Sequence, residues 1–415
     1  MKKSHRVLAG ISLGACAALI AAVPVLSQGN TGTVARYTID AGTTSGMAAM
    51  GAGGGGVGSV LGALGGGGNQ VVHELYLRLG STRAPTGEAR GDHFMPAGAR
   101  LGQSVPLETP RSVSTPRGES TSQPGQMQMP EGRLLLFWGC GEHAGPGQPV
   151  VIDFARMARG EVPPGLYANF ANLPEAWSVN SGNSRTYGEW PNSRDSKRVE
   201  ANSSLLGAHR IASSYAPEIA FDLADDFMPA LRPATRDMAS GAVNLSWNGL
   251  DKATGYYAWV MATNPEGNSR DMVWWTSSSK QAFGGPMSDW ISPAAARQLI
   301  ADGTVMPPSQ TSCAIPAEVR QAGGPMMMTQ LFAYGPQANF SYPERPRNAP
   351  ASWEPEWIAR VRFRANSMVM HGMPGMGDFG GDEEETSRSE PQEPQLPRCR
   401  GGLRGIAERA AGLCQ

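Results

Sequence analysis

The chain has 415 residues, which is enough for two or three ordinary domains, and its formal net charge at pH 7 is −1. A near-neutral charge without a long basic block argues against a nucleic-acid-binding protein. Glycine and proline, at 53 and 33 residues, exceed their average usage and gather in particular segments. We therefore expect folded units that are separated by Gly- and Pro-rich stretches.

The first residues have the order of a secretory signal. Three cations lie among the first six residues, and no charged residue follows from Val7 to Leu26. Small or apolar residues precede a cleavage point after Ser27, which predicts a signal peptide at residues 1–27. Without cleavage the apolar run becomes a membrane anchor, because about 20 apolar residues span a bilayer. In both cases we expect an exported protein, in the periplasm or associated with the outer membrane.

A Gly-rich segment at 46–68 lies between two expected strands, Val34–Asp40 and Val71–Leu79. As low-complexity sequence it is a flexible linker. As a helix it would carry glycine at every fourth position from Gly54 to Gly66, a spacing that lets helices pack closely in membranes. Glycine costs a helix roughly 1 kcal/mol per residue, which favours the linker. The helical alternative implies association with a membrane or the cell envelope.

Short apolar or alternating runs recur between turn residues after Arg133, a pattern typical of an antiparallel β-sandwich. The expected strands are Leu134–Trp138, Pro149–Phe154, Tyr167–Phe170, Leu205–Leu206, Ser213–Tyr215, Ile219–Leu223, Val243–Trp247, Tyr256–Met261, Met272–Thr276, Met326–Tyr334 and Trp357–Phe363. One helix is also well specified. Ser292 can cap it, Pro293 suits its first position, Ala294–Ala301 favours helix and Gly303 can close it.

These patterns predict a mostly β protein with one or two antiparallel β-sandwich-like domains, an inserted short helix, and Gly-rich and disordered segments. Few large apolar residues occur in the Pro-, Ser- and Thr-rich stretch before residue 133 or in the acidic, then Pro-rich end of the chain. The expected units are a signal peptide at 1–27, an N-terminal region at 28–107, a disordered linker at 108–132, a β-rich domain at 133–228, a β-sandwich-like domain at 229–371, and a disordered tail with a short helix at 372–415.

Two of the expected strands, within Val243–Trp247 and Ala253–Val260, resemble the second and third strands of a fibronectin type III domain. In that family an alternating strand ends in a core tryptophan, and a Gly-Tyr step opens the next strand. The resemblance implies that Trp247 fills the space between two sheets and that Tyr256 buries its ring. It is limited to residues 243–260 and implies an architecture, not an activity. The whole chain resembles uncharacterised exported proteins of Gram-negative bacteria, which imply no activity either.

Four cysteines remain after cleavage, an even number that permits disulfides in an exported protein. We favour the pairs Cys140–Cys313 and Cys399–Cys414, with free thiols as the alternative. A helix over Leu403–Leu413 would hold the last two cysteines about 22 Å apart and exclude their pairing.

One group of side chains near the end has a chemistry of its own, because Met368, Met370, His371, Met373 and Met376 fall within nine residues. Thioether sulfur is a soft ligand that suits Cu(I), and imidazole supports either oxidation state of copper. Met-rich segments with Gly and Pro between the methionines resemble copper-handling proteins of the bacterial envelope. Alternatively, the first two methionines belong to one core face of a strand, where methionine fills gaps.

The sequence contains no nucleophile elbow, phosphate-binding loop or His-Glu-x-x-His motif. We therefore expect a non-enzymatic binding or structural role in the cell envelope. Copper binding by the methionines is one alternative. An enzyme whose site assembles only in the fold is the other. The sequence does not identify a protein partner.

Overall fold

The computed structural model describes residues 32–52, 70–110, 132–161, 177–264, 271–282, 285–350 and 353–372. Several expected features lie outside these residues: the signal peptide at 1–27, the repeat from Gly54 to Gly66, the strand Tyr167–Phe170, Met373, Met376, Cys399, Cys414 and the helix Leu403–Leu413. No helix of the described ranges has the length and hydrophobicity that crossing a membrane requires.

The described chain is mostly β, as the sequence predicts. Its strands are β1 (Ala35–Gly46), β2 (Val71–Ser81), β3 (Gly91–Phe94), β4 (Ser104–Pro106), β5 (Arg133–Trp138), β6 (Val150–Asp153), β7 (Thr186–Trp190), β8 (Gly207–Ser213), β9 (Ile219–Leu223), β10 (Ala234–Asp237), β11 (Val243–Ser246), β12 (Gly255–Thr263), β13 (Met272–Thr276), β14 (Ser312–Ile315), β15 (Met327–Tyr342) and β16 (Trp357–His371). Its helical elements are α1 (Met47–Ala52), η1 (Ala97–Ala99), α3 (Phe154–Ala158), η2 (Gly285–Ser288), α4 (Pro293–Ala301) and α5 (Ala317–Gly323).

These strands form three sheets. The largest, which we call the long sheet, has nine strands in the order β6-β5-β13-β12-β15-β16-β1-β2-β7. Two small sheets have the orders β10-β11-β14 and β4-β3-β8-β9. In the long sheet β1 runs parallel to β16 and β13 runs parallel to β5, while the remaining neighbours are antiparallel.

The long sheet has two chemically different faces because side chains alternate along each strand. In β16, Val361 and Phe363 point to one face and are fully buried, whereas Arg362 and Arg364 point to the other. We call these the inner face and the outer face. A bulge in β15 between Tyr334 and Gln337 inserts one extra residue relative to β16 and restores apolar side chains to the inner face beyond it.

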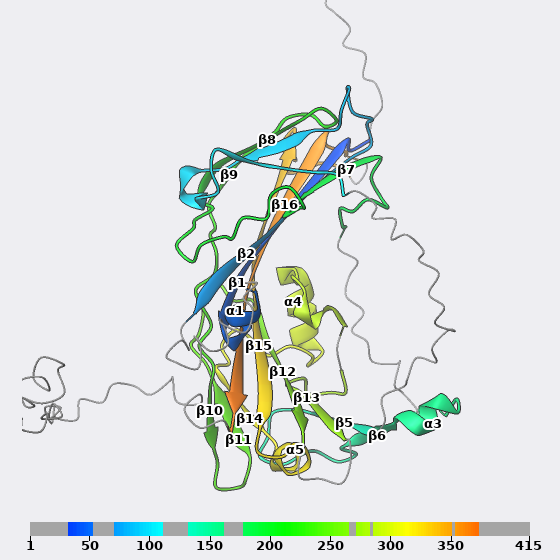
Figure 1. Cartoon of the computed structure of the whole chain (residues 1–415), viewed down its shortest axis with the longest axis vertical. Coiled ribbons are helices and arrows are strands. Elements are labelled where there is room, and N and C mark those ends of the chain that lie inside the picture. The colour runs from blue at the N-terminus through cyan, green and yellow to red at the C-terminus, as the bar shows by residue number, and fades with distance from the viewer. Residues whose placement is uncertain are drawn as a thin grey trace, which may run out of the picture.

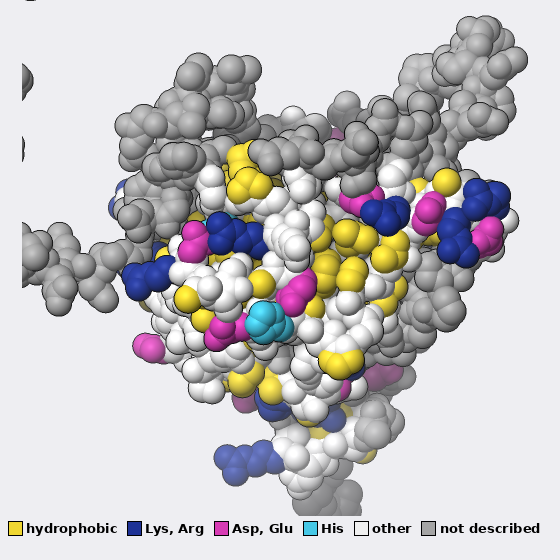
Figure 2. Space-filling view, turned by 90° about the horizontal axis from the view of Figure 1, so that it is seen from below, with side chains coloured by type: hydrophobic (Ala, Val, Ile, Leu, Met, Phe, Trp, Pro, Cys, Tyr) yellow, Lys and Arg dark blue, Asp and Glu magenta, His cyan; other side chains and the backbone are white. Residues whose placement is uncertain are grey.

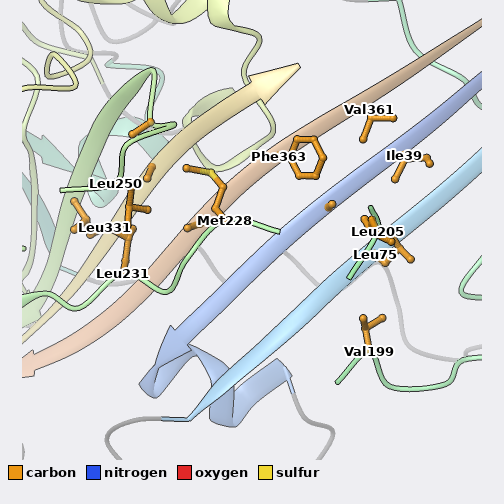
Figure 3. Close-up of a cluster of buried hydrophobic side chains, with 14 of the residues drawn as sticks. Ile39, Leu75, Val199, Leu205, Met228, Leu231, Leu250, Leu331, Val361 and Phe363 are labelled. Atoms are coloured by element: carbon orange, nitrogen blue, oxygen red, sulfur yellow. The ribbon is translucent and has the colours of Figure 1, made fainter. Parts of the chain in front are cut away.

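Both small sheets pack on the inner face and share one hydrophobic core with it. In Figure 1, β8 and β9 lie at one end of the long strands, and β10, β11 and β14 lie at the other. The chain that connects the small sheets crosses the inner face and buries Met228 and Leu231 there (Figure 3). Thr43 Oγ1 donates to the Met228 carbonyl and Ser45 Oγ donates to the Leu231 carbonyl, each at 2.6 Å. These bonds fasten the crossing segment to the end of β1.

The inserted helix α4 forms as predicted. Ser292 Oγ accepts from the Ala295 amide at 3.2 Å, Pro293 occupies the first turn, and Gly303 follows the helix with φ of +78°. Because only glycine adopts that conformation without strain, it ends the helix there. The helix and its flanks pack on the outer face of β12 and β15 through Tyr257, Met287, Ile291, Ala295, Ala296, Leu299, Val305, Phe332 and Tyr334.

The long sheet crosses the expected domain boundaries, since its strands come from the units expected at 28–107, 133–228 and 229–371. A division at residue 228 therefore does not describe this sheet. Two expected strands are also wrong: Leu205–Leu206 lies in a loop, and only the first residue of Ser213–Tyr215 belongs to a strand. Leu205 is buried although it lies outside every sheet. The apolar residue at this position therefore indicated burial and not a strand.

A row of hydrogen-bonded polar rings is buried between the long sheet and β3 and β8. Tyr37 Oη lies 2.8 Å from His93 Nδ1, and His93 Nε2 lies 2.9 Å from His209 Nδ1. His209 Nε2 donates to the Leu205 carbonyl at 2.7 Å, so the Nδ1 of a neutral His209 accepts. Burial lowers the pKa of both histidines, that of His93 well below its ordinary value. Neutral rings thus complete the row, with Tyr37 donating into it.

We expect the protein to lose stability in mild acid. Burial lowers the pKa of His93, His209 and His371, and it lowers the pKa of His73 to about 4. In the unfolded chain these histidines bind protons from about pH 6.5 downwards, whereas the buried rings of the folded chain stay neutral. The free energy of unfolding therefore keeps its full value above that pH and decreases below it. Chemical denaturation should show the free energy of unfolding falling between pH 7.5 and 5.0, by on the order of 1.4 kcal/mol per pH unit for each fully shifted histidine.

The variant His73→Gln should reduce this fall. His143→Gln, which changes a side chain that is 69% exposed, should leave it unchanged. A free energy of unfolding that stays constant from pH 7.5 to 5.0 would contradict the neutral state of the buried histidines.

Candidate binding site on the outer face

Charged side chains form a continuous layer across β16, β1 and β2 on the outer face. Cross-strand register aligns them in rows: Arg360 with Thr38 and Arg78, then Arg362 with Asp40 and Tyr76, then Arg364 with Gly42 and Glu74. We call the charged members, Arg78, Arg360, Arg362, Arg364, Asp40 and Glu74, the arginine layer. The alternation of arginine with valine and phenylalanine in β16 is the local sequence signal for this layer, and sequence reasoning did not use it.

Asp40 is the centre of the layer. Its carboxylate is 2% exposed and accepts from Arg362 Nε at 2.7 Å, from Arg362 Nη2 at 3.0 Å and from Arg78 Nη1 at 2.8 Å. The bidentate contact fixes the plane of the Arg362 guanidinium. Because Asp40 already holds two arginines, it is a structural anion of the site and is not a free base.

Trp290, just after η2, closes the layer on one side. Its ring lies over the Arg364 guanidinium, 3.7 Å from carbon to centroid, and its Nε1 donates to the Ala41 carbonyl at 3.0 Å. A Cβ on Gly42 would lie 3.4 Å from this ring, so glycine lets the indole approach the sheet. Arg364 also pairs with Glu74 at 3.0 Å. The cation is thus held between a carboxylate and an aromatic face.

Arg360 differs from the other three arginines. It is 4% exposed, and no carboxylate of the described residues lies within ion-pair distance of its guanidinium. Burial, followed by the neighbouring Arg362, lowers the pKa of Arg360 to about 10. Its carbon lies 4.4 Å from the centroid of the Trp177 ring. Its Nε and the hydroxyl of Thr38, its register neighbour, are buried without a hydrogen-bond partner among the described residues.

A hollow of about 290 Å³ adjoins the layer at the edge of β2. It exists because β7 pairs with β2 only from Leu77 to Ser81, and the chain after Trp190 leaves the sheet before returning at a bridge between His73 and Val199. The hollow shares Glu74 with the layer, and it is also lined by Tyr76, Trp190, Pro191, Lys197 and Arg198. It is therefore a recess with aromatic and charged lining residues, two of them cationic, beside a cationic layer.

A second group on the outer face consists of methionines. Met261 of β12 is opposite Met328 of β15, and Met328 is opposite Met370 of β16. We call these three the methionine row; Met368 lies two residues before Met370 on the same face. All four are partly exposed. A hydrogen bond from Gln330 to Asn366, at 3.2 Å, separates the row from the arginine layer.

The structure does not bring His371 to these methionines. Side chains alternate, so His371 points to the inner face while Met368 and Met370 point outwards. His371 Nδ1 lies 3.1 Å from Thr235 Oγ1, and its Nε2 lies 3.2 Å from Asp237 Oδ1. Both ring nitrogens are occupied by β10. Met261 and Met328 were missed as partners, because their alignment depends on strand register, which no local pattern gives.

Cys140 and Cys313 form a disulfide, the first of the two pairings favoured from the sequence. It joins the residues after β5, in the long sheet, to β14, in a small sheet. Met306 Sδ lies 3.8 Å from Cys140 Sγ. The bond therefore ties the long sheet to the small sheet β10-β11-β14.

The lower end of the molecule differs from the arginine layer in character. Figure 2 shows the lower end of the molecule, where hydrophobic side chains gather between charged groups of both signs. In the described part of the chain, no three His, Cys, Asp or Glu side chains are grouped so as to hold a metal ion.

No protein-family model, curated protein or solved structure matches the chain. The site must therefore be interpreted from its own geometry.

We expect Asp40→Asn to lower the free energy of unfolding by about 3 to 5 kcal/mol, because it leaves two arginines without their shared buried anion. Asp225→Asn is the matched control. It removes one carboxylate that pairs with Lys252, whose side chain is 57% exposed, and should cost less than about 1 kcal/mol. Urea denaturation of both variants checks this. Equal losses of unfolding free energy in Asp40→Asn and Asp225→Asn would show that the arginine layer does not depend on Asp40.

Proposed function

We propose that this chain is an exported, non-enzymatic binding protein of the cell envelope, and that its arginine layer takes a ligand that carries a carboxylate or phosphate group. Arg360 carries this proposal. A desolvated cation without an anionic partner costs the fold free energy. Contact with Trp177 offsets only part of that cost. Groups that reduce stability in this way are typical of functional sites.

The chemistry of Arg360 favours an oxyanion. A guanidinium presents its donors in a plane that matches two oxygens of a carboxylate or phosphate. The Nε of Arg360 and the hydroxyl of Thr38 are both donors without a partner, and they belong to neighbouring positions on adjacent strands. An oxyanion there would accept from both and would neutralise the excess charge of the row that contains Arg78.

The hollow at the edge of β2 supports a ligand larger than a simple anion. It is lined by the aromatic residues Tyr76 and Trp190 and by the cationic residues Lys197 and Arg198, and it adjoins the layer through Glu74. Pockets of this kind combine apolar surface with a few polar groups that fix orientation. The acid group of the ligand would lie on the layer and its body in the hollow.

The architecture supports a binding role over a catalytic one. We propose that residues 234–371 form a sandwich of the fibronectin type III kind, in which β10-β11-β14 faces β13-β12-β15-β16. Trp247 and Tyr256 support this, since their rings lie 5.4 Å apart in the core between these sheets. Sandwiches of this architecture occur in many cell-surface domains.

Export is supported by the order of residues 1–27 and by the disulfide between Cys140 and Cys313. Disulfides persist in oxidising compartments and are rare in reducing ones.

Binding of an oxyanion should stabilise the protein. Succinate and phosphate serve as the carboxylate and phosphate probes, each compared with chloride at equal ionic strength. We expect one probe to raise the free energy of unfolding by on the order of 1.4 kcal/mol at ten times its Kd. The variant Arg360→Gln should lose this response while being at least as stable as the original protein in chloride, because it removes a buried cation.

Arg232→Gln, at an exposed arginine, is the matched control and should keep the full response. Two results would overturn the proposal: no response to either probe, or an equal response in Arg360→Gln. A larger stabilisation by succinate would indicate that the site prefers a carboxylate, and a larger stabilisation by phosphate would indicate that it prefers a phosphate group.

Export can be tested separately. When the full chain is expressed with its own N-terminus in a Gram-negative host, we expect Cys140 and Cys313 to resist alkylation by a maleimide until a reductant is added. The mass of the purified protein should also be lower than that of its translation product by the mass of residues 1–27. A version that lacks residues 2–27 is the control and should keep both thiols reactive. Reactive thiols at Cys140 and Cys313 in the full chain would contradict export.

A further inference from the structure

We propose that the methionine row, Met261, Met328 and Met370, binds a soft monovalent metal ion, Cu(I) or its analogue Ag(I), on the outer face of the long sheet. The site differs from the one expected from the sequence, Met368, Met370, His371, Met373 and Met376, because it keeps only Met370 of that set and adds two methionines from other strands. It also lies apart from the arginine layer. The two proposals can therefore fail separately.

Register is the first support for this site. Three neighbouring strands each place a methionine at the same level of the sheet and on the same face. Neighbouring strands lie about 4.8 Å apart, so the outer two methionine backbones are about 10 Å apart with the third between them. Each side chain has three rotatable bonds, which is enough reach to turn the outer sulfurs towards the middle one.

Exposure is the second support. Helix α4 and its flanks cover the outer face at Tyr257, Phe332 and Tyr334, and that cluster does not include the methionine row. The three methionines are partly exposed and belong to neither of the two hydrophobic clusters. They are therefore reachable by a solute, and core filling does not account for them.

The donor type selects the metal. Three thioethers are soft and neutral, a set that suits Cu(I) and gives little binding to Zn²⁺ or other ions that prefer nitrogen or oxygen. Met368 lies on the same face two residues along β16, so a fourth thioether stands beside the row. Trp274 is opposite Met261 on the other side of β12, which places an indole next to the site.

The test is anaerobic titration of the full chain with Cu(I), in competition with a chromogenic Cu(I) chelator, and with Ag(I). We expect one equivalent to bind and Met328→Leu, at the centre of the row, to weaken binding at least tenfold. Met261→Leu and Met370→Leu should weaken it as well. Leucine keeps the side-chain volume, so each variant should retain its fold, which thermal melting confirms. Zn²⁺ should not compete.

Three matched variants separate this site from others. Met95→Leu alters a buried methionine elsewhere, and His371→Gln alters the histidine on the inner face; both should bind as the original chain does. The double variant Met373→Leu, Met376→Leu should also keep its affinity. The proposal is overturned if no equivalent binds, if Met328→Leu binds normally, or if the double variant accounts for the loss.

Discussion

The parallel pairing of β1 with β16 is the constraint on which the rest of the structure depends. Its register sets, over twelve residue pairs, which side chains of both strands face the small sheets and which face outwards. A slip of β1 by one residue would turn its side chains to the opposite faces, so that Asp40 would enter the hydrophobic core and Ile39 would face outwards. The same pairing therefore specifies the packing of Tyr37, Ile39, Val361 and Phe363 and assembles the charged layer.

The two faces show how one sheet serves two purposes. On the inner face, apolar side chains join two small sheets into one core, and the few polar groups there, such as His93 and His371, are neutralised by burial and held by hydrogen bonds. On the outer face, charge is retained where stability alone would not favour it. The buried anion of Asp40 is matched by arginines, but Arg360 is left in excess. The outer face, which retains this cation, is the one on which we place binding.

Sequence reasoning succeeded where the determinant is local. The cap, first-turn proline and closing glycine of α4 act within a dozen residues, strand β9 alternates buried and exposed residues, and strand β13 is a dense apolar run. It failed where the determinant is distant. The strands β3, β7 and β8 mix polar and apolar residues, and the pairings of β7 with β2 and of β3 with β8 join segments that are far apart in the chain. The methionine row and the Asp40–Arg362 pair depend on register between strands, which a single sequence does not reveal.

The β1–β16 pairing also has a consequence during synthesis, because the chain is made from β1 towards β16. Asp40 and Arg362 are 322 residues apart, so a nascent chain exposes the edge of β1 long before its partner exists. Until then that edge is an open template for any other extended chain. The molecule cannot close its largest sheet while it emerges; it must be kept from self-association until the last described strand has been made. Loss of the C-terminal strand alone would leave two edges, those of β1 and β15, open for good.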